Sequence, residues 1–222
     1  MVNLLPLVAA FGLGDHVILF VDDDAPFGGD GLSWEHPLSS LQNAMDLVTF
    51  LPGSSYEFRL AGGRYTPLDD AGFVFSDLPD VTIRGGYAGV DGGDVQDPDL
   101  YPTVLDGDRL GNDDSGSYDD NARFILDFTA IARAVTIEDL GIHNAGGVDG
   151  QLSVALFGDG MDALTLRNVT FDGCGENKGA VLRARRTLLT MESCRFIDCR
   201  QEFILECLAV DSVALVGTEF RG

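Results

Sequence analysis

Two loops rich in glycine and aspartate carry the residue types that bind calcium. The stronger candidate, here called the 106–120 loop, offers the side-chain oxygens of Asp106, Asp108, Asn112, Asp113, Asp114, Asp119 and Asp120. The weaker candidate, the 22–30 loop, offers those of Asp22, Asp23, Asp24 and Asp30. Ca2+ takes about six to eight oxygen ligands, commonly from flexible loops. Neither loop matches the EF-hand spacing or the glycine-rich nonapeptide repeat, which keeps simply solvated acid open as the alternative. Because the 106–120 loop offers the larger set of oxygen ligands, we expect one structural Ca2+ there.

The four cysteines are a second set of reactive side chains. Cys174 and Cys199 hold the same place in two copies of one motif, "LTLRNVTFDGC" and "LTMESCRFIDC". If the copies stack as neighbouring strands, their Cα atoms lie about 5 Å apart, inside the range of about 4.4–6.8 Å that disulfides need. A Cys174–Cys199 disulfide and a pair of buried free thiols are both open. The cysteine spacings lack a Cys-x-x-Cys pair, which argues against a zinc site.

The motif that holds these cysteines occurs four times in the second half of the chain. The copies start at Val135, Leu164, Leu189 and Val213, so successive starts are 29, 25 and 24 residues apart. In each copy apolar and polar residues alternate on both sides of one break, as in two short β-strands. The break falls at Asp139, Asn168, Ser193 and Gly217, residue types that tolerate a left-handed backbone.

A period of this length predicts a stacked-repeat architecture. A further short apolar strand precedes each copy, in "RFILDF", "SVALFG", "AVLRAR" and "EFILEC", which leaves no room for a helix in the repeat. We therefore expect an all-β parallel β-helix, a solenoid whose levels are hydrogen-bonded about 4.8 Å apart and whose apolar columns point inward. Glu138, Arg167 and Glu192 should then form an outward row of alternating charge, with Arg195 beside Glu219.

The N-terminal half follows a different pattern. The segment "PLSSLQNAMDLV" predicts an amphipathic helix with a serine cap at Ser39 or Ser40. Its apolar face holds Leu38, Leu41, Met45 and Val48. The segment "VTIRGGYAG", which starts at Val81, looks like an early copy of the repeated motif.

Several segments in fixed order carry a family resemblance: "FVDDDAPFGGDGLSW", "SLQNAMDL", "LAGGRYTP", "VTIRGGYAG", "DPDLYPTVLDGD" and "DDNARFIL". Together they resemble the opening of many secreted bacterial right-handed parallel β-helix proteins of the pectin-lyase-like group. The resemblance covers the chain from about Val21 to the end. It implies a right-handed parallel β-helix, a secreted or cell-surface location, and a short helix that caps the N-terminal end of the stack.

The residues that catalysis would need lack their expected partners. Glycosidases of this shape need clustered carboxylates on adjacent coils, and lyases need a basic residue near calcium-binding aspartates. His143 should face outward, but we expect no carboxylate pair beside it in the next copy, where the equivalent residue is Asp172. The "RARR" segment at 183–186 has no matching aspartate cluster. The sequence therefore names no catalytic residue, and whether the protein is an enzyme stays open, with a non-catalytic role favoured.

The composition limits the class of partner. The chain has 222 residues and a net charge of −22, and its first 122 residues hold 22 acidic and only 4 basic side chains. Such a surface repels the phosphates of nucleic acids and anionic membranes. No stretch approaches the roughly 20 apolar residues of a membrane span. We therefore expect no nucleic-acid partner and no membrane span.

Three parts follow from these patterns. Residues 1–20 form an N-terminal segment, either a signal remnant plus the first strand or a plain hydrophobic strand. Residues 21–122 form the cap and first coils with their Asp/Gly-rich loops, and residues 123–222 form the regular coils. The last copy, "VALVGTEFRG", is as regular as those before it and has no closing segment. An uncapped coil exposes strand edges and core, so we expect end-to-end self-association or continuation in a longer chain.

These expectations favour a secreted or cell-surface β-helix domain without catalytic activity, which binds a glycan or another surface partner or acts as a scaffold. One alternative is a polysaccharide-active enzyme, a lyase or a glycoside hydrolase. Another is a structural or adhesive module of a longer surface protein. The fold class alone does not decide between them.

Overall fold

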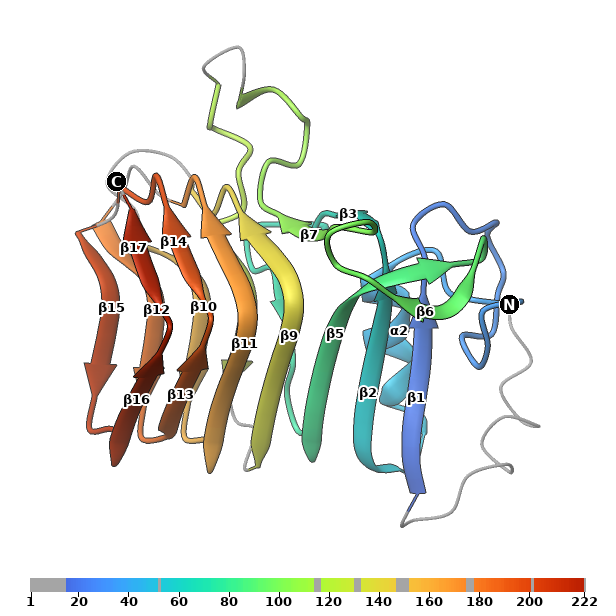
Figure 1. Ribbon diagram of the computed structural model, residues 1–222, viewed down its shortest axis with the longest axis horizontal. Helices are drawn as coiled ribbons and strands as arrows, with labels where there is room; N and C mark the ends of the chain where they lie inside the picture. Colours follow the sequence, from blue (N-terminus) through green and yellow to red (C-terminus); the bar gives the residue numbers. More distant parts are fainter. Residues whose placement is uncertain are drawn as a thin grey trace.

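The protein is built almost entirely from β-strands in two sheets (Figure 1). The computed structural model describes residues 15–51, 53–113, 117–129, 133–146, 152–174, 178–200 and 202–221. The first sheet holds β1 (Asp15–Val21), β2 (Gly53–Ala61), β3 (Gly63–Tyr65), β5 (Asp80–Gly89), β6 (Gly93–Gln96), β7 (Thr103–Asp106), β9 (Ala134–His143), β11 (Ala163–Asp172), β13 (Leu188–Glu192), β14 (Arg195–Ile197), β16 (Ser212–Val216) and β17 (Glu219–Arg221). The second sheet holds β4 (Phe73–Val74), β8 (Phe124–Thr129), β10 (Leu152–Asp159), β12 (Lys178–Arg185) and β15 (Phe203–Leu208).

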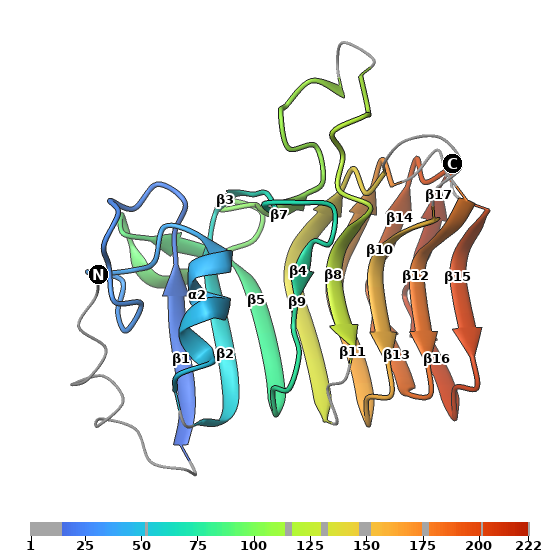
Figure 2. The same cartoon turned by 180° about the vertical axis from the view of Figure 1, so that it is seen from behind.

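From β8 onward the chain passes from one sheet to the other and back, so each sequence repeat adds a level to both sheets (Figures 1 and 2). Neighbouring strands run parallel, and the β5–β6 hairpin is the antiparallel exception among the described strands. The four short strands that we expected upstream of the motif copies are β8, β10, β12 and β15. The expectation of an all-β fold of parallel strands is therefore confirmed.

The strand register matches the apolar columns of the sequence. Val135 pairs with Leu164, which pairs with Leu189, which pairs with Val213. In the fourth column Ile142 pairs with Phe171, and the rings of Phe171, Phe196 and Phe220 stack with centroids 4.7 Å and 4.9 Å apart. The buried members of both columns, up to Leu189 and Phe196, belong to one core that lies between the two sheets.

The break in each motif copy is a left-handed residue. The backbone φ is 58° at Asp139, 50° at Asn168, 55° at Ser193 and 60° at Gly217. A left-handed residue turns the strand once without interrupting the stack, and Asn, Asp and Gly accept this conformation at low cost. The Asn168 side-chain amide also donates to Asp139 Oδ1 (2.8 Å), which links two successive bends.

The α-helix α2 (Leu41–Val48) closes the core near the N-terminus. Ser40 caps it, because its hydroxyl accepts from the Asn43 N–H at 3.2 Å. The four predicted apolar residues, Leu38, Leu41, Met45 and Val48, are all buried. The helix packs on β1 and β2, in the layer that the second sheet occupies elsewhere but does not reach there (Figure 2).

One motif copy is split by an insertion. The first half of β9 pairs with β5, with Val81 opposite Val135 as predicted, whereas its second half pairs with β7. Residues 90–102 lie between β5 and β7 in sequence and include the β6 hairpin strand. The described parts of the connection between β7 and β8 project beyond the strand ends (Figure 1).

The last level leaves part of the core side exposed. Leu215 and Phe220 are 45% and 51% exposed, whereas Met191 and Phe196, one level further in, are buried. Leu215 is in register with Met191 and Phe220 with Phe196.

Candidate functional site

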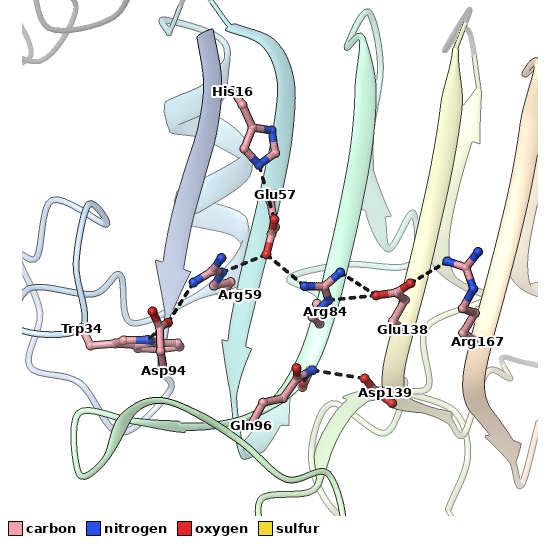
Figure 3. A network of polar contacts seen from close by, with 11 residues as sticks. His16, Trp34, Glu57, Arg59, Arg84, Asp94, Gln96, Glu138, Asp139 and Arg167 are labelled. Carbon is pink, nitrogen blue, oxygen red and sulfur yellow. Dashed lines mark hydrogen bonds and ion pairs between the residues drawn. The ribbon is translucent and has the colours of Figure 1, made fainter.

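The outward face of the first sheet carries a continuous row of alternating charges (Figure 3). Arg167 contacts Glu138 (Nη1–Oε1, 2.7 Å) and Glu192 (Nε–Oε2, 3.1 Å), as the sequence predicted. On the other side Glu138 contacts Arg84 (2.8 Å), and Arg84 contacts Glu57 (3.6 Å). The row therefore crosses β13, β11, β9, β5 and β2, because parallel strands in register place equivalent outward positions side by side.

The N-terminal end of this row is anchored by aromatic rings. Arg59 contacts Glu57 (2.8 Å) and Asp94 (2.9 Å), and its guanidinium lies 5.6 Å from the ring centroids of Phe20 and Tyr87. The Trp34 indole N–H also donates to Asp94 Oδ1 at 2.8 Å (Figure 3). These contacts tie β6 and the segment after β1 onto the sheet.

The rings of this cluster support the sheet rather than line an open binding surface. Phe20 and Trp34 meet edge to face with centroids 5.0 Å apart, and Trp34 lies 5.6 Å from Tyr87. Trp34 and Tyr87 are 8% and 4% exposed.

The Glu57 carboxylate of the row is held in the ionised form. Burial raises the pKa of Glu57, but hydrogen bonds and charges from Arg59, Arg84 and His16 outweigh it and lower the pKa overall. For Arg84, burial is opposed by hydrogen bonds to Tyr87 and Glu138, and the pKa is raised. A carboxylate with a lowered pKa is a poor general acid near neutral pH.

The outermost predicted neighbours lie side by side, but the acidic residue forms its ion pair with a third residue. Arg195 and Glu219 are opposite one another in β14 and β17. The ion pair of Glu219 is formed with Arg221 of its own strand, at 2.5 Å.

In the 106–120 loop, two of the predicted calcium ligands have structural roles. Asp108 accepts hydrogen bonds from the N–H groups of Gly111 (2.7 Å), Asn112 (3.1 Å) and Asp113 (3.3 Å). Asp106 accepts from Arg64 Nε (2.6 Å), from the Asp108 N–H (3.0 Å) and from Asn144 Nδ2 (3.0 Å). Arg64 also donates to the Asp108 carbonyl. These bonds shape the loop from the end of β7.

The other predicted ligands of this loop differ in their surroundings. Asp113 Oδ2 accepts from the side-chain amide of Asn121 (3.0 Å), a buried residue that the sequence reasoning missed. Asp120 Oδ2 accepts from the Leu110 N–H at 2.9 Å. Asp119 is exposed. Asp114 lies outside the described residues.

The weaker candidate loop brings three carboxylates together. One oxygen of each of Asp22, Asp23 and Asp24 lies within 4.8 Å of the others. Asp22 accepts from the N–H groups of Asp24 (3.0 Å) and Val90 (2.8 Å), and Asp23 accepts from the Arg64 N–H (3.0 Å). Burial is the main cause of a raised pKa at Asp23. Asp30 is not part of this group and accepts from the Leu32 N–H instead.

His143 has more acidic neighbours than the sequence indicated. In the strand register it lies between Asp172 of β11 and Asp106 of β7. The sequence comparison identified only Asp172, because Asp106 belongs to the split motif copy. Burial lowers the pKa of His143, against the opposing charges of Asp172 and Asp106, so the imidazole is neutral at pH 7. Asp106 is already bound by Arg64.

The four cysteines are free thiols, and Cys174 and Cys199 interact. A hydrogen bond with Cys199 and complete burial raise the pKa of Cys174, whereas the same bond lowers the pKa of Cys199. Cys174 Sγ also lies 3.4 Å from the Ile142 carbonyl. The disulfide stays a prediction that the close pairing of the two side chains makes testable.

Comparison of the chain with protein-family models, with curated proteins and with solved structures gives no match. In the part of the chain that the structure describes, no helix is long and apolar enough to cross a membrane.

Proposed function

We propose that the chain is a right-handed parallel β-helix module, secreted or displayed at a cell surface, which binds a glycan on the outward face of its first sheet without transforming it. The observation that carries this proposal is the charged row, which extends over five neighbouring strands as a flat, pre-arranged set of hydrogen-bonding groups. The alternation of strands between two sheets supports the β-helix, and the sequence resemblance supports the pectin-lyase-like group.

The arrangement of the row favours binding over catalysis. Its central members, Glu57 and Glu138, have side chains only 11% and 13% exposed and are ion-paired with arginine. Its ends are open: Arg167, Glu192, Asp94 and His16 are about half exposed or more. Fixed central charges hold the end groups in position, and positioned donors and acceptors recognise sugar hydroxyls at low entropic cost.

The net charge narrows the ligand class. A surface with a net charge of −22 repels acidic polysaccharides, so a neutral or amino-bearing glycan fits this face better. An acidic glycan would need a bridging cation.

A glycan array tests the proposal. Wild-type protein should bind a subset of neutral or amino-bearing glycans, and Arg167→Ala should weaken that binding at least tenfold. Arg186→Ala is the matched control, because Arg186 is also an exposed arginine paired with a carboxylate (Asp159, 2.6 Å) but follows β12 of the second sheet. Absence of binding to every glycan, with and without Ca2+, would reject the proposal.

One observation favours a polysaccharide-active enzyme as the second candidate. Asp106 and Asp172 flank His143 one strand away on either side, which separates their backbones by about 9.5 Å. Inverting glycosidases place their carboxyl groups about 6.5–9.5 Å apart. Release of reducing ends from a polysaccharide that is lost in His143→Ala, and kept in Arg167→Ala, would select this candidate.

The third candidate is a structural or adhesive module. A further β-level placed on β16 and β17, from the same chain or from another copy, would cover Leu215 and Phe220. Light scattering over a wide concentration range tests self-association: Phe220→Asp should abolish any concentration-dependent increase in mass.

A further inference from the structure

In the part of the chain that the structure describes, two buried side-chain oxygens, on Asp113 and Asn121, have no hydrogen-bond partner. They are Asp113 Oδ1 and Asn121 Oδ1. Asn121 is only 3% exposed. The Asn121 side-chain nitrogen, Nδ2, donates to two acceptors, Asp113 Oδ2 (3.0 Å) and the Asn144 carbonyl (3.3 Å). The unpartnered atom of the side-chain amide is therefore its oxygen, Oδ1. Buried acceptors are nearly always satisfied in folded proteins, so this pair calls for a ligand.

The charges around this pair are unbalanced. The carboxylates of Asp108, Asp106 and Asp120 lie near that of Asp113. The neighbouring arginines are engaged elsewhere: Arg64 contacts Asp106, and Arg109 contacts Asp70 and the Asp120 carbonyl. The carboxylate of Asp113 therefore lies in a negative environment without a cationic partner of its own.

Three backbone N–H groups next to these oxygens in the sequence are bound to another acceptor. The N–H groups of Gly111, Asn112 and Asp113 all point to the Asp108 carboxylate. What remains is a site that offers only oxygens and carries excess negative charge, which is the preference of a hard divalent cation. We propose that Asp113 Oδ1 and Asn121 Oδ1 are ligands of one structural calcium ion beside the 106–120 loop.

The 22–30 loop lacks the observation that carries this proposal. Its Asp22 and Asp23 carboxylates accept backbone N–H groups, and none of its described side-chain atoms is a buried oxygen without a partner. The two loops therefore provide an internal comparison. Calcium binding at this site does not depend on the proposed glycan binding, because the site lies apart from the charged row in sequence. Calcium binding is also measured in the absence of a glycan.

Thermal unfolding and calorimetric titration of the full chain, first treated with EDTA, test the site. Calcium at about 100 times its dissociation constant should raise the melting temperature by about 5–10 °C, and magnesium should do so less. Three variants that each remove one carboxylate charge are compared: Asp113→Asn in the proposed site, Asp24→Asn in the other loop, and Asp91→Asn at an exposed turn.

In EDTA, Asp113→Asn should melt at a higher temperature than the wild type, because it removes a buried and repelled charge. In calcium it should lose at least half of the calcium-induced increase, whereas Asp24→Asn and Asp91→Asn should keep it. A residue with a structural role alone is not expected to raise the melting temperature in EDTA when it is substituted and also to reduce the calcium-induced increase. Unchanged melting of the wild type in calcium would overturn the proposal and indicate that water satisfies the oxygens. A calcium effect lost only in Asp24→Asn would move the site to the 22–30 loop.

Discussion

The two halves of this chain use the same parallel strands but obtain their order from different interactions. From β9 to β17 the stack is set by repeated apolar columns and by one left-handed residue in each copy. From β1 to β7 the strands are interrupted by loops, and side-chain carboxylates bind backbone N–H groups to shape them. The first 122 residues accordingly hold 22 of the 36 acidic residues.

This difference shows that aspartate has several roles in one molecule. Asp139 adopts a bend, Asp108 organises a loop, and Asp94 joins an aromatic cluster to the sheet. A count of acidic residues does not separate these roles, whereas their hydrogen-bond partners do. Mutations in the two halves should therefore fail in different ways.

The largest expected effect is in the regular half. Phe171→Ala removes a buried ring between Ile142 and Phe196, and should lower the free energy of unfolding by about 3–5 kcal/mol. Phe220→Ala, one level beyond Phe196 and 51% exposed, should cost only about 1 kcal/mol. Urea unfolding measures both, and equal losses would contradict the account of the open last level.

A smaller effect is expected at the left-handed bends. Asn168→Val places a β-branched residue at φ 50° and should cost about 1–2 kcal/mol more than Asn168→Gly. Both substitutions remove the hydrogen bond to Asp139, so the difference between them reports the backbone alone. If the two variants unfold at the same urea concentration, residue 168 does not adopt this conformation.

The charged row should make stability depend on pH with a defined sign. The folded-state pKa of Glu57 is lowered, so its contribution is complete above the unfolded pKa, near 4.5, and is lost as the pH falls through the folded value. Glu57→Gln should therefore destabilise the protein by about 1–2 kcal/mol at pH 7 and by much less near pH 3. Glu192→Gln, at the exposed end of the row, should cost less than about 1 kcal/mol. An equal cost of Glu57→Gln at both pH values would mean that its charge is not involved.

The cysteine pair gives the smallest expected effect. In denatured, unreduced protein four thiols should react, since all four cysteines are free in the structure. Cys174→Ala should slow the oxidation of Cys199, whose pKa the paired thiol lowers. Two reactive thiols in denatured, unreduced protein would establish the Cys174–Cys199 disulfide instead.

Much of the regular half could be predicted because its signals repeat. Four copies give the apolar columns, the bends and the outward row, and each of these depends only on short-range alternation. The helix α2 was also predictable, because its apolar face and the cap at Ser40 lie within one segment.

Prediction from the sequence failed where an insertion separates the contacting residues. The partner of β9 is divided between β5 and β7, so neither Arg84 beside Glu138 nor Asp106 beside His143 appears as a motif at the repeat distance. Asn121 was missed for a related reason. It follows an aspartate cluster but is buried by packing near Asn144, and burial at that point depends on tertiary structure.

The strand register is the central claim, and methyl–methyl NOE measurements on Ile-, Leu- and Val-labelled protein test it most directly. Leu164 should show cross-peaks to Val135 and to Leu189, its partners one level away on either side. No cross-peak should join Val135 to Leu189, because they are two levels, or about 9.6 Å, apart. Contacts shifted by one or more residues, or an absence of Leu164–Leu189 contact, would contradict the register on which the core, the bends and the charged row depend.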